Sequence, residues 1–187
     1  MLVTIDHPKA KILYRKTIDF KPEEFPYAVR DAWRLLMQGI EPFFPAAGLA
    51  APQVGSNRSI FIYSYDRKPE NLTCAINPTY EPLSDETRSS WEGCLSVIHS
   101  GNCFQLASIP RYLKIRVRYL NLDGEVVELV LQDFGAKVFQ HEYDHLQGIL
   151  NINHPQAEVK AFASKEALQE FSAEVRQKDA AHYQKPS

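Results

Sequence analysis

The sequence predicts an α+β fold, with antiparallel sheets around a central helix and a further helix towards the C-terminus. Two observations support this prediction. Short segments with strand-like patterns follow one another between residues 60 and 131. Segments with helical periodicity stand before and after them, rather than between them. A doubly wound fold would need strands and helices that alternate along the chain.

The first element in chain order is a helix, which we expect to begin near Pro26 and to end before Pro42 and Pro45. Because one face of this segment is apolar at helical spacing, the helix should pack against the core. The residues of that face are Phe25, Val29, Trp33, Leu36, Met37 and Ile40.

Four strands are expected after this helix. Residues 60–65 and 72–78 are rich in β-branched and aromatic side chains, and the second segment should stop at Pro78. Residues 114–120 alternate strictly, and the turn sequence at 121–124 joins them to 125–131 as an antiparallel hairpin. One face carries Ile115, Val117 and Tyr119, and the other carries Lys114, Arg116 and Arg118.

Two helices are expected in the last third of the chain. The first should run from Asp133, as its N-cap, to Gln147, with Gly148 as the stop. The second should start from Pro155 and fray before Lys185. Its weaker apolar stripe consists of Val159, Phe162, Leu168, Phe171 and Val175.

Composition narrows the class of protein. The 187 residues are 44% hydrophobic and 24% charged, which is typical of a globular domain. A net charge of −2 gives no reason to expect a nucleic-acid or membrane partner. No apolar run approaches the ~18 residues of a spanning helix, and the N-terminus does not resemble a secretory signal. Since the three cysteines also suggest reduced thiols, we expect a cytoplasmic monomer.

The most informative motif is QHEYDH at residues 140–145, a His-Glu-x-x-His pattern on a predicted helix. Residues four apart share a helix face, so His141 and His145 can reach one metal ion. Glu142 can then address a water molecule at that ion. The alternative is a pair of histidines with unrelated roles.

A catalytic metal site needs a third protein ligand and an open position. The longer zinc-protease pattern would place it at Asn151, but a neutral amide is a poor ligand. A second protease pattern uses a downstream carboxylate, for which Glu158, Glu166 and Glu170 are available. We favour the upstream thiol of Cys94, although a free cysteine is often only a small buried side chain. We interpret Cys74 and Cys103 as small buried side chains of this kind.

Three segments occur in order: AGLAAPQVG from Ala47, EGCLS from Glu92 and QHEYDHLQG from Gln140. Together they resemble the three signature motifs of peptide deformylases, and the resemblance extends over roughly residues 12–150. It implies an α+β metal-dependent hydrolase that removes the formyl group from the N-terminal formyl-methionine of newly made polypeptides. On this basis we assign residues 1–153 to a catalytic domain and residues 154–187 to a C-terminal helical extension of the same domain.

The resemblance also implies roles for residues. The metal ligands would be Cys94, His141 and His145, and Glu142 would be the general acid and base. Gln53 and the backbone N–H of Leu95 would bind the formyl oxygen. One divalent ion is implied, often Fe²⁺ in this family, with Zn²⁺, Ni²⁺ or Co²⁺ as alternatives.

Other residues are assigned to the substrate from their chemistry. Gly48 and Gly93 lack side chains where a peptide backbone would come close, although ordinary tight turns would explain them too. Phe134 and Val138 lie four apart on the His141 side of the helix, so they could line a methionine pocket or simply belong to the core. Glu92 is expected to pair with Arg111 or another basic residue and so support the ligands, although a solvated ion pair would explain it too.

The sequence departs from the family pattern at two places. Ala46 stands where the first motif usually has a glycine, and residues 97–109 lengthen the segment between the cysteine motif and Pro110. We expect this segment to be a loop at the rim of the cleft, with His99 exposed.

Two other functions remain open at this point, a zinc endopeptidase and a noncatalytic module stabilised by metal. The C-terminal helix is a candidate contact to the ribosome, where formylated chains emerge.

Overall fold

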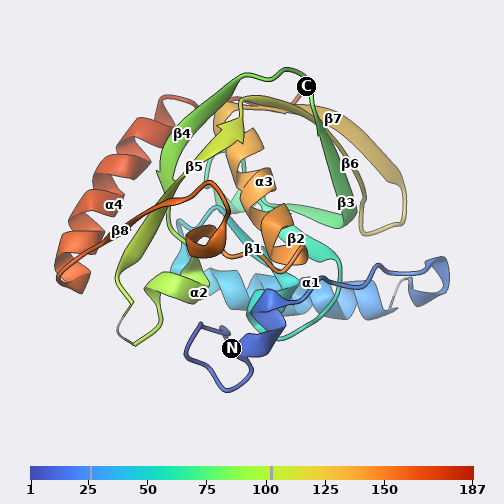
Figure 1. Cartoon of the computed structure of the whole chain (residues 1–187). Coiled ribbons are helices and arrows are strands. Elements are labelled where there is room, and N and C mark those ends of the chain that lie inside the picture. The colour runs from blue at the N-terminus through green and yellow to red at the C-terminus, as the bar shows by residue number, and fades with distance from the viewer. Residues whose placement is uncertain (26, 102) are drawn as a thin grey trace.

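The computed structural model describes residues 1–25, 27–101 and 103–187. The predicted helix start near Pro26 lies outside the described residues. Figure 1 shows one long helix, α3, in the middle of the molecule with a sheet on either side of it. The α+β prediction is therefore confirmed. No helix in the described ranges is long and apolar enough to span a membrane.

Both sheets are entirely antiparallel. The larger sheet has the order β1-β2-β3-β6-β7, and the smaller has the order β4-β5-β8. The strands of the larger sheet are β1 Gly48–Ala50, β2 Ile60–Tyr63, β3 Thr73–Pro82, β6 Lys114–Leu120 and β7 Val126–Gln132. Those of the smaller sheet are β4 Thr87–Glu92, β5 Gln105–Tyr112 and β8 Glu158–Ala161.

Four α-helices and several short 3₁₀ helices complete the described fold (Figure 1). The α-helices are α1 Tyr27–Ile40, α2 Leu95–Ile98, α3 Asp133–Leu146 and α4 Lys165–Ala180. The 3₁₀ helices are η1 Ala10–Tyr14, η2 Pro22–Glu24, η3 Glu41–Phe43, η4 Ala51–Val54, η5 Pro69–Asn71 and η6 Asn151–Asn153.

The central helix α3 has the predicted bounds to within one residue. Gly148 ends it with φ +76°, where an added Cβ would lie 2.7–2.9 Å from the backbone of Tyr14 and Arg15. The predicted N-cap is wrong in one respect, because Asp133 is the first helical residue and no side chain caps the helix. Its carboxylate instead accepts hydrogen bonds from Arg88 and Gln184.

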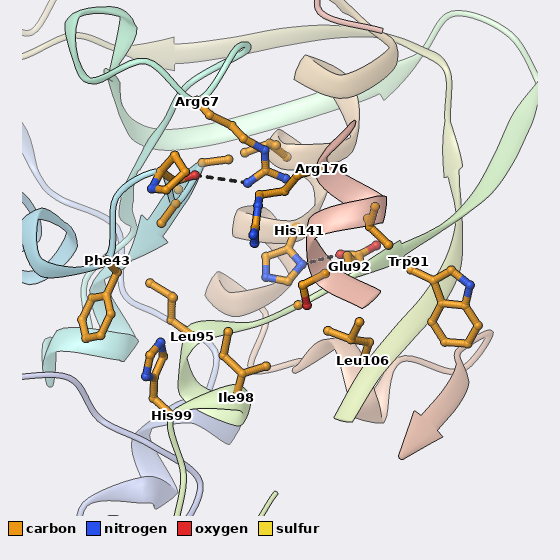
Figure 2. Close-up of a pocket in the computed structure, with 18 of the residues that line it drawn as sticks. Phe43, Arg67, Trp91, Glu92, Leu95, Ile98, His99, Leu106, His141 and Arg176 are labelled. Carbon is orange, nitrogen blue, oxygen red and sulfur yellow. Dashed lines mark hydrogen bonds and ion pairs between the residues drawn. The ribbon is translucent and has the colours of Figure 1, made fainter. Parts of the chain in front are cut away.

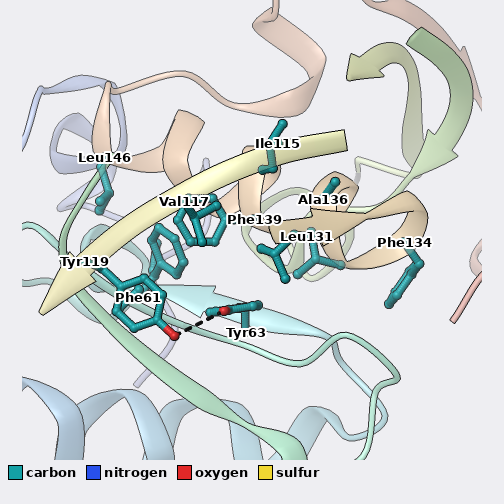
Figure 3. Packing of buried hydrophobic residues seen from close by; sticks show 13 residues of the cluster. Phe61, Tyr63, Ile115, Val117, Tyr119, Leu131, Phe134, Ala136, Phe139 and Leu146 are labelled. Carbon is teal, nitrogen blue, oxygen red and sulfur yellow. Dashed lines mark hydrogen bonds between the residues drawn. The ribbon is translucent and has the colours of Figure 1, made fainter. Parts of the chain in front are cut away.

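Aromatic packing holds α3 on the larger sheet (Figure 3). The Phe139 ring of α3 is fully buried and lies 4.9 Å from the Phe61 ring and 5.3 Å from the Tyr63 ring, both edge to face. Such pairs contribute about 0.5–1.5 kcal/mol each beyond their burial. Because this contact fixes the rotation of α3, it also fixes the direction in which the histidines point.

The antiparallel hairpin β6–β7 is confirmed, with β7 one residue later than predicted and Leu120 paired with Val126. Ile115, Val117 and Tyr119 are buried, and the three basic residues between them are exposed. The stop at Pro78 is wrong, because β3 continues to Pro82. The register shifts between Ile76 and Thr79, and this irregularity accommodates a residue without a backbone N–H.

Strands β4, β5 and β8 were not anticipated. Strand β4 pairs over its full length with residues 107–112 of β5, so only part of the segment 97–109 is a loop. The tail from Pro155 contains the exposed edge strand β8 before α4 begins, so the single long helix is wrong. Each of these strands is short or too polar to give a strong periodic pattern. Helix α4 is capped by Ser164 and buries Leu168.

Candidate metal centre and cleft

The predicted ligands come together in space. The Sγ of Cys94 and the nearest ring nitrogens of His141 and His145 all lie within 4.8 Å of one another. Cys94 Sγ is 3.4 Å from His145 Nε2. The two histidines are one turn apart on α3, and Cys94 follows β4 directly before α2. Cys94 and His145 are buried, and the His141 side chain is 12% exposed, so the site opens to one side.

A buried charge network orients these ligands. Glu92 Oε2 accepts a hydrogen bond from His141 Nδ1, and this leaves His141 Nε2 for a metal ion. Arg111 donates to both oxygens of Glu92, at 3.0 and 3.1 Å, so the predicted Glu92–Arg111 pair is present. Arg111 also donates to Asp144 at 2.6 Å, a partner that sequence reasoning missed. Burial favours the neutral form of Glu92, but Arg111 and His141 lower its pKa below the usual range.

The donor set fits a divalent transition metal. One thiolate and two imidazoles suit iron, zinc, nickel or cobalt rather than calcium or magnesium. Burial lowers the pKa of His145 well below its ordinary value, which favours the neutral ring that a metal requires. Three protein ligands also leave a coordination position for water, as in catalytic sites.

Glu142 lies beside this centre with an unusual environment. The residue is 4% exposed, and its Oε2 has no hydrogen-bond partner among the described residues. Burial raises the pKa of Glu142 to about 7, close to the pH at which a proton carrier works best. A Cβ at Gly48 would lie 2.5 Å from Glu142 Oε1. The absence of a side chain at Gly48 therefore makes room for the carboxylate.

Two donors flank the centre on another side. Gln53 is buried, and its Oε1 accepts from the Ala50 N–H at 2.9 Å, which turns its Nε2 towards Cys94 Sγ (3.6 Å) and Ser96 Oγ (3.2 Å). Leu95 is the first residue of α2, so its backbone N–H has no carbonyl to bond within the helix. Gly93 lies two residues before Leu95, and an added Cβ there would lie 3.1 Å from the Leu106 side chain.

A pocket of about 500 Å³ opens over these groups (Figure 2). All residues that the sequence assigned to catalysis or substrate binding line this pocket, and so does the metal ligand His141. They are Gly48, Gln53, Gly93, Leu95, Phe134, Val138 and Glu142. Phe134 and Val138 are also buried in the apolar cluster that contains Phe61 and Phe139, so they belong both to the core and to the pocket wall.

Sequence reasoning missed one wall of the pocket. Helix α4 contributes Leu168, Val175 and Arg176, and Arg67 and Lys137 approach from other elements. The apolar stripe of α4 was visible in the sequence, but nothing there indicated which surface it would cover. Ala46 also lines the pocket, and so does His99, which is exposed as predicted, with its ring 4.6 Å from that of Phe43.

The alternative third ligands lie elsewhere. Asn151 is buried and donates from Nδ2 to the Glu92 carbonyl at 3.0 Å, so it supports the chain beside Cys94. Glu158, Glu166 and Glu170 are exposed on β8 and α4, and the metal-ligand group formed by the described residues contains none of them. Cys74 packs against an apolar cluster that includes Leu36, Ile62 and Ile76, and Cys103 donates to Gln105 at 3.3 Å.

Known proteins share both the sequence and the fold. A family model described as polypeptide deformylase matches residues 1–161. Peptide deformylase 2 of Ralstonia nicotianae is 41% identical over 111 residues, which cover 56% of this chain and 60% of that protein. A peptide deformylase of Thermotoga petrophila is 41% identical over 59% of this chain and 62% of its own. The alignments thus span about three fifths of these relatives.

Solved structures are similar over a larger share of their length. The peptide deformylase of Thermotoga maritima has a TM-score of 0.69 at 30% identity and covers 81% of this chain and 94% of its own. A Met-Ala-Ser-bound class I type b peptide deformylase from Acinetobacter baumannii has a TM-score of 0.69 at 28% identity, and the match covers 81% and 98%.

Proposed function

We propose that this chain, which belongs to the polypeptide deformylase family, hydrolyses the N-formyl group of formyl-methionyl peptides and releases formate. The observation that carries the proposal is the convergence of Cys94, His141 and His145 beside the buried carboxylate of Glu142, whose Oε2 has no partner among the described residues. These groups line or underlie one pocket that is large enough for the end of a peptide.

Cys94, His141 and His145 would hold one divalent ion, with Fe²⁺ as the proposed resident metal and Zn²⁺, Ni²⁺ or Co²⁺ as substitutes. When bound, the ion supplies a Lewis acid that activates water at neutral pH. Glu92 keeps the His141 ring in its ligating orientation through Nδ1, and Arg111 holds Glu92 in turn. This support explains why two charged residues are buried so close to the centre.

Glu142 would carry the proton of the reaction. It accepts a proton from the attacking water and delivers it to the peptide nitrogen as the formyl C–N bond breaks, so that formate and a free amine leave. Its raised pKa, caused by burial, matches both halves of this transfer. Gly48 keeps the space in which the carboxylate can approach the substrate.

Gln53 and Leu95 would stabilise the negative charge that develops on the formyl oxygen. The hydrogen bond from Ala50 to Gln53 Oε1 points Nε2 towards the centre before substrate arrives. A preorganised donor of this kind contributes about 2.7–4 kcal/mol to transition-state stabilisation. The Leu95 N–H would be the second donor.

The methionine side chain is assigned to the wall formed by Phe134 and Val138, with Gly93 leaving room for the substrate backbone. A Met-Ala-Ser peptide bound to the Acinetobacter baumannii relative supports this class of ligand. Action on nascent peptides as a cytoplasmic monomer belongs to the same proposal.

The test is formate release from formyl-Met-Ala-Ser by protein purified anaerobically, together with its metal content. Cys94→Ser should abolish both, whereas an endopeptidase with a downstream carboxylate ligand would tolerate the change. Glu142→Ala should keep the metal and lose formate release. Full activity in a metal-loaded Glu142→Ala protein would refute the role of Glu142, and an unchanged Cys94→Ser protein would refute the site.

Ribosome contact through α4 stays a prediction. Removing the chain after Asn153 would also remove β8 and a wall of the pocket. Charge reversal at the exposed residues Glu174 and Lys178 is therefore the cleaner test, with ribosome pelleting as the readout. Unchanged pelleting of both variants would argue against contact through this face.

A further inference from the structure

One end of the pocket carries more positive charge than its surroundings neutralise. Arg67, Lys137 and Arg176 line this end. Asp179 of α4 is the carboxylate beside them, and it accepts hydrogen bonds from both Lys137 Nζ and Arg67 at 3.1 Å. The Asp179 carboxylate is thus shared by two cations, and Arg176 adds a third positive charge.

Arg176 is the cation that remains unmatched. Figure 2 shows its side chain reaching from α4 into the pocket, on the side where Arg67 and His141 lie. Within the described ranges, Arg176 makes no hydrogen bond or ion pair. The residues three and four positions away on its own helix are Ser172, Ala173, Asp179 and Ala180. The carboxylate among them, Asp179, is already bonded to Arg67 and Lys137.

The other carboxylates of the pocket are not free to pair with Arg176. Glu92 is occupied by Arg111 and His141. Glu142 is buried beside Gly48, where its Oε1 would lie 2.5 Å from an added Cβ. The guanidinium therefore faces the pocket with its donors available, and guanidinium donors match carboxylate geometry in pairs.

Helix α4 is held firmly enough to present this group in a fixed place. The Phe171 ring packs 5.7 Å from Trp91 of β4 and 5.3 Å from Phe162, and Lys160 Nζ lies 4.1 Å above the Phe171 ring. Asp179 anchors the end of the helix through Arg67 and Lys137. The backbone of Arg176 is therefore fixed beside the pocket, and only its exposed side chain has to be ordered when a ligand binds.

We infer that Arg176 is a specificity-determining residue that binds a carboxylate of the peptide near its formylated end. This inference rests on the proposed function, because it concerns which formyl peptides the pocket prefers. The carboxylate has two possible sources, an Asp or Glu side chain after the methionine, or the terminal carboxylate of a short peptide.

The experiment compares matched peptides on metal-loaded protein. Formyl-Met-Asp-Ser-amide and formyl-Met-Asn-Ser-amide differ in charge at the second residue, and formyl-Met-Ala-Ser is used as acid and as amide to test the terminal carboxylate. The wild-type protein should favour one carboxylate over its neutral match by about tenfold in kcat/KM, the effect of one charge-assisted hydrogen bond. Arg176→Gln should bring that ratio close to one, and Arg176→Glu should invert it.

Lys178→Gln is the matched control, because Lys178 is exposed on the same helix and does not line the pocket. It should keep the wild-type ratio. No preference in the wild-type protein, or an equal preference in Arg176→Gln, would overturn the inference while leaving deformylation intact.

A binding measurement distinguishes the role of Arg176 from the proposed deformylase activity. Calorimetry with the deformylated peptides Met-Asp-Ser-amide, Met-Asn-Ser-amide and Met-Ala-Ser, as acid and as amide, needs no turnover. If no peptide releases formate, the proposed function fails. Arg176 is then still supported if its loss removes the carboxylate preference in binding, and refuted if that loss changes nothing.

Discussion

Gly48→Ala places one methyl group against the proposed proton carrier. The added Cβ would stand 2.5 Å from Oε1 of Glu142 and 2.8 Å from both Cδ and Cγ. Ordinary contacts begin near 3.4 Å, so the carboxylate must withdraw by about 0.9 Å. A misplacement of about 1 Å costs a catalytic group roughly 10²-fold in rate, or about 2.7 kcal/mol. We therefore expect kcat/KM to fall about 100-fold while the metal content stays at the wild-type level.

The assay is formate release from formyl-Met-Ala-Ser, with metal analysis on the same samples. Because overpacking also costs about 1–3 kcal/mol of stability, circular dichroism must show a folded protein at the assay temperature. Gly101→Ala is the control, since its nearest neighbour would be Asp6 at 3.4 Å, an ordinary contact. A folded, metal-loaded Gly48→Ala protein within twofold of wild type would refute the reasoning.

Three further changes test other parts of the account. Arg111→Met leaves Glu92 and Asp144 buried without their partner, so the free energy of unfolding in urea should fall by about 3–5 kcal/mol. A fall below about 1 kcal/mol would show that these buried carboxylates do not depend on Arg111. Val138→Asp should raise KM for formyl-methionyl peptides in a folded protein, and an unchanged KM would remove Val138 from the pocket. Burial raises the pKa of Cys74 to about 12, so its thiol should resist iodoacetamide at pH 8 until urea is added, and prompt native-state alkylation would contradict its packing.

Much of the site could be predicted because its chemistry is local in the sequence. His141, Glu142 and His145 lie within one helical turn, and the helix bounds followed from periodicity and Gly148. Their link to Cys94 crosses 47 positions or more, and only the resemblance of three ordered motifs supplied it. The Glu92–Arg111 pair was also expected, but its extension to Asp144 depends on the rotation of α3 that Phe139 fixes in the core.

The parts that could not be predicted depend on tertiary pairing. The edge strand β8 is exposed throughout and owes its conformation to pairing with β5, which no pattern in residues 158–161 reveals. The place of α4 over the pocket depends on the contacts of Phe171 and Asp179 with distant elements. The position of Arg176 in the pocket could therefore not be predicted from the sequence, in which it is one of several charged residues on a solvated helix.

X-ray absorption on the zinc-loaded protein tests the central claim most directly. If one thiolate and two imidazoles bind a single ion, the spectrum will show one sulfur near 2.3 Å and nitrogen or oxygen ligands near 2.0–2.1 Å, and Cys94→Ser will not retain the ion. A first shell without sulfur in the wild-type protein would contradict it.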